Sequence, residues 1–540
     1  MTRRLPIAAV IALFTLGTAG WLWWQGPGAS RRALERYPRI VLVSLDTLHV
    51  DFTGVLSPEV AYTPELDRLA ADGTVMTQAR TTVPMTLPAH TSLLSGRTPL
   101  SLGVLHNGER IAADIETLPQ ALEAAGYRTG AFLSLATLRQ EFGLDRGFEI
   151  YNDGHGTVPR FYRTADEVHG AATAWLETVK GDPFFLWVHL SDPHEPYATI
   201  GAAPDTVVDL DGVELGRFPL VLKERHDLAV QLPPGRHFLR WTSLRQRRPD
   251  DQPETSLRLR FRDNTNLSAH IADWSSIPSP DIGLEEPFVL ELENKGDTTL
   301  EVMVRFDGGV RKPPPSEVLA NYAAEVEFVD SYVGRLREVV EADGEDVLWI
   351  VVSDHGEGVY RRGDLIGHAG FGLEDQLRIL WLMSGPGVPA GRRLETEPAL
   401  IHDVAPTVLD LLGLPGLDRT DGVSFVPCWR KQDCPEERRW SAHGFNRPLG
   451  RLSAVATYRW PLKVLVQTAN GSGSYDLAAD PWEALDLSRT DDAELALDLR
   501  RLQRDLQEVT ALLERRLSDA GEDLSDEDLE MLRSLGYLGD

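Results

Sequence analysis

A threonine hydroxyl stands at the start of an apolar segment, in the sequence Thr86-Leu-Pro-Ala-His90. The proline and the apolar residues that follow, up to Gly96, predict a buried helix with the threonine in its first turn. The free N–H groups and the dipole at a helix N-terminus favour an anionic attacking oxygen and an anionic substrate. Because a threonine hydroxyl is a poor nucleophile at neutral pH, it needs a base or a metal ion to hold it as the alkoxide.

Two apolar runs, at 39–45 and 348–352, have the composition of buried parallel strands. Asp46 follows the first run, and Asp354 and His355 follow the second closely. Ligands bind at the carboxyl ends of strands in open α/β sheets, so we expect these side chains to meet the threonine there. The four residues form a plausible ligand set for one divalent cation such as Ca, Mn or Zn. Taken singly, an aspartate after a strand is more often a turn or a helix cap.

Agreement with a known family extends along much of the chain. The matching segments include LDTL (45–48), TPELDRLA (63–70), TLPAHTSLLSGR (86–97), HLSDPHEPY (189–197), SDHGE (353–357) and DVAPT (403–407). On these segments the chain resembles a sulfatase-type member of the alkaline phosphatase superfamily, over roughly 40–200 and 316–490. The resemblance implies a doubly wound α/β body with a mixed or parallel sheet. It also implies a metal-dependent hydrolase of sulfuric or phosphoric esters.

The sequence departs from the formylglycine sulfatases at the nucleophile. Those enzymes carry a Cys-x-Pro-x-Arg arrangement, and this chain has Thr86 and His90 at the two outer positions. Thr47 replaces the second aspartate of their usual pair, and the stretch 132–135 replaces their sulfate-holding Gly-Lys-Trp-His. An Asp, Thr, Asp, His metal set is similar to that of threonine-nucleophile phosphodiesterases and of phosphoglycerol or phosphoethanolamine transferases. The resemblance therefore supports phosphate esters at least as well as sulfate esters.

Several other residues take roles through the same resemblance. Candidates for the acid and the base of a two-step reaction through Thr86 are His189, His194 and His368. Candidates for substrate contacts are His90, His106 and Asn107. A second metal ion, held by Asp192, His194 and His368, is an alternative to the single site. Any one of these histidines could also be an ordinary packed or surface residue.

Two other functions compete with ester hydrolysis. A transferase would hand the group from the threonine to a sugar or lipid hydroxyl instead of water. A pseudoenzyme would use the fold only to bind envelope glycans, and the intact metal set argues against it.

The chain of 540 residues is too long for one ordinary core. The predicted segments are an anchor and linker at 1–37, the two parts of the catalytic domain at 38–200 and 316–490, an inserted β-sandwich-like domain at 201–315, and a C-terminal helix with an acidic tail at 491–540. Strands inside the insert are predicted from period-two patterns at 206–210, 228–232, 256–261, 288–293 and 300–306. A helix is predicted at 316–340, and a leucine stripe at 495–517 predicts a helix that docks on its own domain rather than on a partner.

The N-terminus bears on localisation. Arg3 and Arg4 precede an apolar run at 5–24, which is long enough to span a bilayer and ends in tryptophans. The pattern predicts a single-pass anchor in the cell membrane. The family resemblance implies that the body lies outside the cytoplasm, in the periplasm or at the cell exterior. A cleaved signal peptide is the alternative, because small residues at 18–20 could suit a peptidase.

Charge and cysteine content restrict the partners. The formal net charge of −28 argues against nucleic acid or an anionic membrane surface as the main partner. An anionic ester substrate, such as one on an envelope glycan or lipid, must therefore be attracted locally by the cation. Cys428 and Cys434, the only cysteines, could close a short loop in an oxidising compartment. Two thiols cannot build a zinc site, so metal ligands must come from Asp and His.

Overall fold

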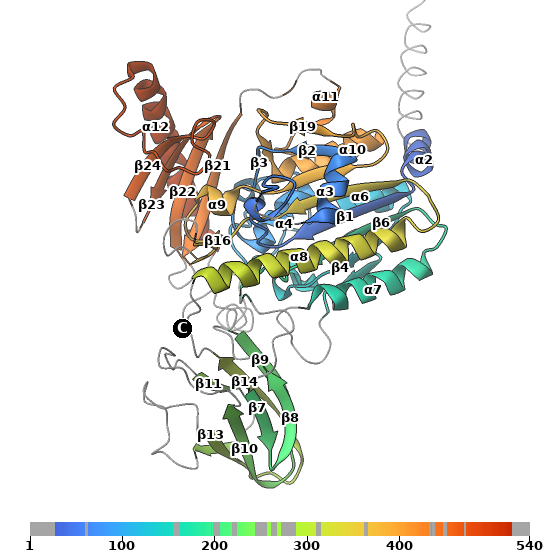
Figure 1. The fold of residues 1–540 in the computed structure, drawn as a ribbon, viewed down its shortest axis with the longest axis vertical. Helices are drawn as coiled ribbons and strands as arrows, with labels where there is room; N and C mark the ends of the chain where they lie inside the picture. Colours follow the sequence, from blue (N-terminus) through green and yellow to red (C-terminus); the bar gives the residue numbers. More distant parts are fainter. Residues whose placement is uncertain are drawn as a thin grey trace, which may run out of the picture. The chain divides into compact units, whose positions relative to one another are not determined.

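The computed structural model describes residues 27–520, except for 60–62, 155–162, 196, 198–205, 219–223, 244–255, 261–266, 272–287, 309–314, 361–365, 431–433, 435–437, 447–450 and 469–470. These residues divide into two compact units (Figure 1). The first unit comprises the described parts of Met1–Gly154, Phe161–Asp192 and Val326–Asp540. The second comprises those of His155–Arg160 and Pro193–Glu325.

An eight-stranded mixed sheet forms the centre of the first unit, in the order β19-β2-β18-β15-β1-β6-β4-β5. Its strands are β1 (Arg39–Leu45), β2 (Gly73–Met76), β4 (Arg128–Phe132), β5 (Ile150–Asn152), β6 (Phe184–Leu190), β15 (Val347–Ser353), β18 (Trp381–Ser384) and β19 (Arg392–Leu394). The five strands from β15 to β5 are mutually parallel, whereas β18 is antiparallel to β15 and to β2. Together with the all-β second unit, this mixed α/β sheet confirms the predicted fold class.

The register of the three central strands sets the position of the predicted metal ligands. Leu45, the last residue of β1, pairs with Ser353 on one side and with Leu190 on the other. Asp46 and Asp354 therefore leave two neighbouring parallel strands at the same level. The continuous apolar runs explain this position, because strands buried on both faces need apolar residues at every position.

Helices cover both faces of the sheet (Figure 1). The principal ones are α2 (Pro27–Arg36), α3 (Pro64–Ala71), α4 (Thr86–Ser95), α6 (Leu118–Ala125), α7 (Ala165–Thr178), α8 (Pro315–Val340) and α10 (Val404–Leu412). On one face, Val43 and Val188 of the sheet line a small cavity with His169 of α7 and Tyr332 of α8. On the other face, the alternate residues of β1 and β6 share one core with α4 and α10. Helix α8 confirms the predicted helix at 316–340.

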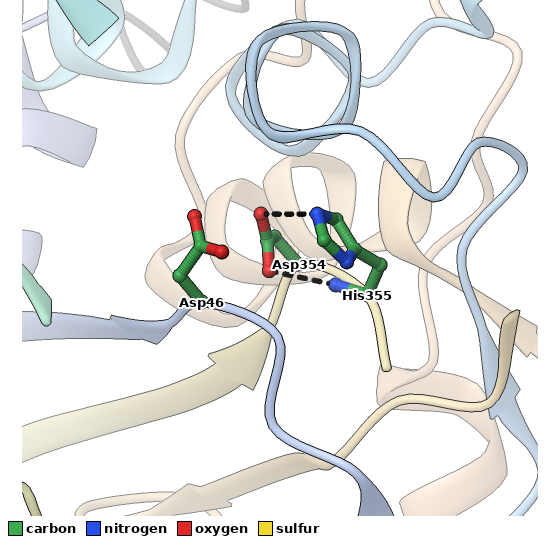
Figure 2. Close-up of side chains that lie close together, drawn as sticks. All are labelled: Asp46, Asp354 and His355. Atoms are coloured by element: carbon green, nitrogen blue, oxygen red, sulfur yellow. Dashed lines mark hydrogen bonds and ion pairs between the residues drawn. The ribbon is translucent and has the colours of Figure 1, made fainter. Parts of the chain in front are cut away.

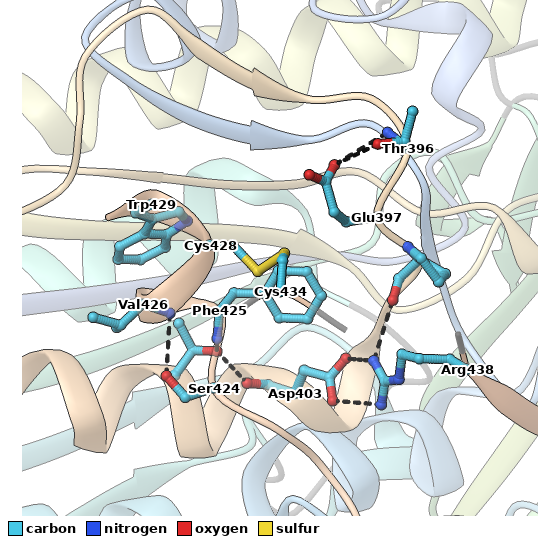
Figure 3. The surroundings of a disulfide bond; sticks show 12 residues. Thr396, Glu397, Asp403, Ser424, Phe425, Val426, Cys428, Trp429, Cys434 and Arg438 are labelled. Carbon is cyan, nitrogen blue, oxygen red and sulfur yellow. Dashed lines mark hydrogen bonds and ion pairs between the residues drawn. A yellow bond between two sulfur atoms is a disulfide. The ribbon is translucent and has the colours of Figure 1, made fainter. Parts of the chain in front are cut away.

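Shorter elements complete the first unit. They are η1 (Val50–Phe52), β3 (Ala79–Arg80), α5 (Pro99–Leu102), η2 (Ala136–Leu138), η3 (Gln140–Phe142), β16 (Gly358–Val359), β17 (Ile366–Gly367), α9 (Glu374–Leu377), β20 (Ala399–Leu400), η5 (Ile401–Asp403) and α11 (Val426–Trp429). Cys428 in α11 forms a disulfide with Cys434 (Figure 3). The buried ion pair between Asp403 and Arg438 is drawn in the same figure.

A second, antiparallel sheet near the C-terminus was not predicted from the sequence. This C-terminal sheet consists of β21 (Arg439–Asn446), β22 (Arg451–Arg459), β23 (Leu462–Gln467) and β24 (Gly471–Asp476), in that order. Helix α12 (Ala493–Ala520) packs on it, and the leucines of its predicted stripe share a core with Val455 and Val464. The expected docking of this helix on its own domain is therefore confirmed. The predicted acidic tail, from residue 521, lies outside the described residues.

The second unit contains two antiparallel sheets, ordered β12-β13-β10-β7-β8 and β11-β14-β9. Its strands are β7 (Thr206–Leu210), β8 (Val213–Phe218), β9 (Glu224–Leu232), β10 (Gly235–Ser243), β11 (Ser256–Arg260), β12 (Leu267–Ile271), β13 (Phe288–Asn294) and β14 (Leu300–Gly308). The five predicted strands correspond to β7, β9, β11, β13 and β14. The sequence patterns missed β8, β10 and β12.

The predicted membrane anchor at 5–24 lies outside the described residues. Of the helices that the structure does describe, none combines the length and the apolar character needed to cross a membrane.

Candidate active site

Asp46, Asp354 and His355 come together at the carboxyl ends of β1 and β15 (Figure 2). One ligand atom from each lies within 4.8 Å of the others, and all three side chains are fully buried. Within the described part of the chain, this is the group of Asp, Glu, His and Cys side chains that could hold a metal ion. The structure thus brings together three of the four predicted ligands in one cluster.

Backbone amides hold the Asp354 carboxylate in place. Its Oδ1 accepts hydrogen bonds from the N–H of Thr47 at 3.2 Å and from the N–H of His355 at 2.7 Å. Thr47 makes its bond from a left-handed backbone conformation with φ 55°. The other carboxylate oxygen, Oδ2, accepts no hydrogen bond and lies 3.4 Å from His355 Nε2.

The charges of this cluster fit a divalent cation. Burial, and then the charge of Asp46, raise the pKa of Asp354 well above its usual range. Two buried carboxylates this close repel each other, and a bound cation would offset both charges. Carboxylate oxygens and imidazole nitrogen are donors that Mn²⁺ and Zn²⁺ accept, and Ca²⁺ accepts the oxygens. The donor set therefore fits the metal that the sequence predicted, without fixing its identity.

Thr86 is the first residue of α4, and its hydroxyl is buried without a hydrogen-bond partner. Asn107 fixes this helix end, because its Oδ1 accepts a hydrogen bond from the N–H of Leu87 at 2.9 Å. The Asn107 amide nitrogen is also buried and has no partner. Asn107, predicted as a substrate contact, thus supports the first turn of α4, and substrate binding by its amide nitrogen stays a prediction.

His90 connects the helix to the carboxylates. Its Nδ1 donates to the Thr86 carbonyl at 2.8 Å and lies 3.7 Å from Asp354 Oδ2. Burial, with the neighbouring His189 second, lowers the pKa of His90 to about 3, so the ring is neutral. Its Nε2 is then an unprotonated acceptor, and it has no partner in the structure. The predicted substrate contact is thus a buried support for Thr86, and direct binding of substrate by His90 stays a prediction.

His189, a predicted acid or base, is engaged with a metal ligand. Its Nε2 lies 3.2 Å from Asp46 Oδ2, and a carboxylate can only accept, so this nitrogen donates. The strand register explains the contact, because His189 pairs with Ser44 two residues before Asp46. This hydrogen bond suits a residue that orients Asp46, as outer partners of metal ligands do.

His368 lies beside the metal cluster. Its ring centroid is 4.6 Å from that of His355, and its Nδ1 lies 3.1 Å from Glu357 Oε2. Glu357 is fully buried and received no role from the sequence, although it closes the SDHGE segment. The contact with Glu357 restrains the orientation of the His368 ring.

His106 and Asp192 of the first unit do not belong to this cluster. His106 lies 3.4 Å from Glu109 and contacts the ring of Phe445. Asp192 accepts a hydrogen bond from the N–H of Ala165, at the start of α7. His194 belongs to the second unit, where it bonds to the Glu195 carbonyl. The second metal ion stays a prediction.

The sulfatase family model matches residues 38–414, which is more than half of the chain. An arylsulfatase from Clostridium perfringens is 23% identical over 485 residues, covering 86% of this chain and 93% of that protein. Among solved structures, a putative sulfatase from Bacteroides thetaiotaomicron aligns with a TM-score of 0.57 at 18% identity, over 90% of this chain and 94% of that one. The phosphonate monoester hydrolase of Agrobacterium radiobacter aligns with a TM-score of 0.56 at 19% identity, over 89% and 96%.

Three observations point to the same family. They are the carboxylates at the strand ends, the helix that begins with a hydroxyl residue, and the match to the family model. The chain therefore belongs to the sulfatase family and is an ester hydrolase.

Proposed function

We propose that this protein hydrolyses a sulfate or phosphate ester with Thr86 as the nucleophile. The observation that carries the proposal is the state of the Thr86 hydroxyl. It is fully buried, has no partner, and begins a helix whose backbone is linked through His90 to the metal-binding carboxylates. A buried hydroxyl without a hydrogen bond is costly, so it is a group kept for a ligand or a substrate.

Asp46, Asp354 and His355 would hold the divalent ion, with Thr86 as fourth ligand. The bound ion would lower the hydroxyl pKa and offset the negative charge of the substrate. Thr86 Oγ then forms a bond to the phosphorus or sulfur atom, while the bond from that atom to the leaving oxygen breaks. The leaving oxygen takes a proton, and a phospho- or sulfothreonine remains. Attack by water on this ester releases the inorganic or singly esterified acid and restores the Thr86 hydroxyl.

His368 is the histidine that we propose for proton transfer. Its Nδ1 is paired with Glu357, whereas His189 uses its Nε2 on Asp46. The His368 ring would give a proton to the leaving oxygen in the first step. In the second step it would accept a proton from the attacking water.

The substrate class rests on the family and on the nucleophile. The relatives include an arylsulfatase and a choline-sulfatase, and the structural neighbours include a phosphonate monoester hydrolase. Threonine cannot become formylglycine, and a phosphodiester is therefore our first candidate and a sulfate ester our second. We further propose that the chain acts outside the cytoplasm, anchored by the apolar run at 5–24, on an ester of an envelope glycan or lipid.

The test compares three aryl esters, a phosphodiester, a phosphate monoester and a sulfate, with purified residues 27–540 loaded with Mn²⁺, Zn²⁺ or Ca²⁺. We expect the Thr86→Ala variant to lose activity on the order of 10³-fold or more. Thr86→Ser keeps the hydroxyl and should retain a measurable part of the wild-type activity. Full activity in Thr86→Ala would refute the proposal. Ester rather than free acid formed in the presence of an added alcohol would instead support the transferase.

A further inference from the structure

Residues 367–372, here called the His368 loop, have every backbone carbonyl hydrogen-bonded. Two of these bonds are local: Gly367 O accepts from the Gln376 side chain at 3.0 Å, and His368 O accepts from the N–H of Gly370 at 3.0 Å. The other four carbonyls, those of residues 369–372, all accept from the C-terminal sheet. Backbone carbonyls of a loop are normally satisfied by water or by the loop itself, so four consecutive bonds to one sheet are an unusual restraint.

The four donors come from three neighbouring strands. Ala369 O accepts from the N–H of Phe445 in β21 at 2.7 Å, and Gly370 O accepts from the Ser453 hydroxyl in β22 at 2.6 Å. From β23, the Gln467 side chain donates to Phe371 O at 2.6 Å, and Lys463 Nζ donates to Gly372 O at 2.8 Å.

The backbone of the loop shows why it needs external support. Ala369 has φ 73°, a left-handed conformation that costs a residue with a Cβ about 1 kcal/mol or more. The loop also approaches the sheet very closely: a Cβ added to Gly444 of β21 would lie 2.8 Å from Ala369 O. Strain of this kind persists only where the surroundings determine the conformation.

We infer that the C-terminal sheet positions His368 for proton transfer, with Ser453 and Gln467 as positioning residues. This inference rests on the proposed function, because it assumes that His368 moves a proton in the reaction. The loop is tied to the metal cluster on its other side, where His368 stacks near His355 and bonds to Glu357. The sheet therefore fixes the distance between the acid–base ring and the metal ligands, without touching the substrate.

The experiment removes two donors in the variant Ser453→Val/Gln467→Met, in which methionine approximates the length of glutamine and valine has the shape of threonine. Both residues are only partly buried, so folding should survive. We expect kcat to fall between about 10- and 100-fold with KM unchanged within about twofold, because misplacing a catalytic group slows chemistry more than binding. Amide hydrogen exchange in residues 369–372 should become roughly 30-fold faster. Ser453→Thr, which keeps the hydroxyl, should restore the activity lost in Ser453→Val.

A matched control is Thr468→Val, which removes a hydroxyl that bonds only to Leu452 within the same sheet. It should leave kcat and the exchange of the loop unchanged. Wild-type kcat in the double variant, while His368→Ala is strongly impaired, would overturn the inference and leave the proposed function intact. Unchanged exchange of the loop amides would overturn it as well. If His368→Ala or Thr86→Ala turns over like the wild type, the proposed function itself fails.

Discussion

Several polar atoms of the candidate site, near the start of α4 and on Asp354, are already engaged in hydrogen bonds. Asn107 Oδ1 accepts a hydrogen bond from the N–H of Leu87, and His90 Nδ1 donates one to the Thr86 carbonyl. Asp354 Oδ1 accepts hydrogen bonds from two backbone amides. Three other polar atoms of these residues are buried without a hydrogen bond: Thr86 Oγ, the Asn107 amide nitrogen and Asp354 Oδ2. These are the atoms that the proposed function assigns to the nucleophile, to a substrate donor and to a metal ligand.

Asp192 provides a prediction at the residue scale. Burial raises its pKa from 3.8 to about 7, and its Oδ2 has no hydrogen bond. Because the folded state prefers the protonated form, stability falls as pH rises from about 4 to about 7, by an amount on the order of 4 kcal/mol at most. Asp192→Asn should flatten this dependence and unfold at a higher temperature than the wild type at pH 8. The check is thermal unfolding of both proteins from pH 4 to pH 8.

A loss of stability in Asp192→Asn would point to metal binding by this carboxylate. If Asp192→Asn destabilises the protein at pH 8 and lowers the number of bound metal ions, the carboxylate is a ligand of a second ion. Metal content after dialysis separates the two outcomes.

At the scale of elements, local sequence patterns predicted the strand ends that carry the candidate site better than they predicted the elements that surround it. The ends of β1 and β15 follow continuous apolar runs, so Asp46 and Asp354 could be placed from the sequence. The C-terminal sheet could not, because β24 (GSGSYD) has no alternation of apolar and polar residues. The partner of His189 also depends on the register between β1 and β6, which only the folded sheet defines. Glu357 and Asn107 gain their roles through similar tertiary contacts.

A buried ion network joins the C-terminal sheet to β3 and α9, at a junction within the first unit. Lys463 of β23 bonds to Glu374 at 3.0 Å and to Glu483 at 2.5 Å, and Glu374 also bonds to Arg80 at 2.7 Å. The side chains of Lys463, Arg80 and Glu374 are all fully buried. The two cations lower the pKa of Glu374 to about 2 in spite of its burial.

Lys463→Met should therefore destabilise the protein by about 3–5 kcal/mol, because it leaves buried carboxylates without that ammonium group. Denaturant unfolding of the metal-free protein measures the change. Arg31→Ala breaks an exposed pair with Glu35 and should leave the free energy of unfolding almost unchanged. A loss as small as this in Lys463→Met would mean that the network contributes little to the junction.

At the scale of the whole molecule, the net charge of −28 opposes an anionic substrate. The repulsion acts over a distance that added salt shortens, to about 10 Å at 0.1 M. We therefore expect kcat/KM to rise several-fold between about 20 and about 500 mM NaCl, and to rise more for a doubly charged phosphate monoester than for a singly charged diester. Steady-state kinetics across the salt series is the measurement. A falling kcat/KM would indicate that a local positive field guides the substrate.

The pairing of β1 with β15 also bears on how the chain folds. The bond from Thr47 to Asp354 spans 307 residues, so the metal site forms only after a very long loop has closed. Loop-closure entropy grows with the logarithm of length, and the insert at 201–315 adds only roughly 0.4 kcal/mol to that cost. The family fold can thus accept, lose or exchange a β-unit at this point with almost no thermodynamic penalty to the site. The insert can therefore diverge in sequence and structure while the residues of the candidate site stay unchanged.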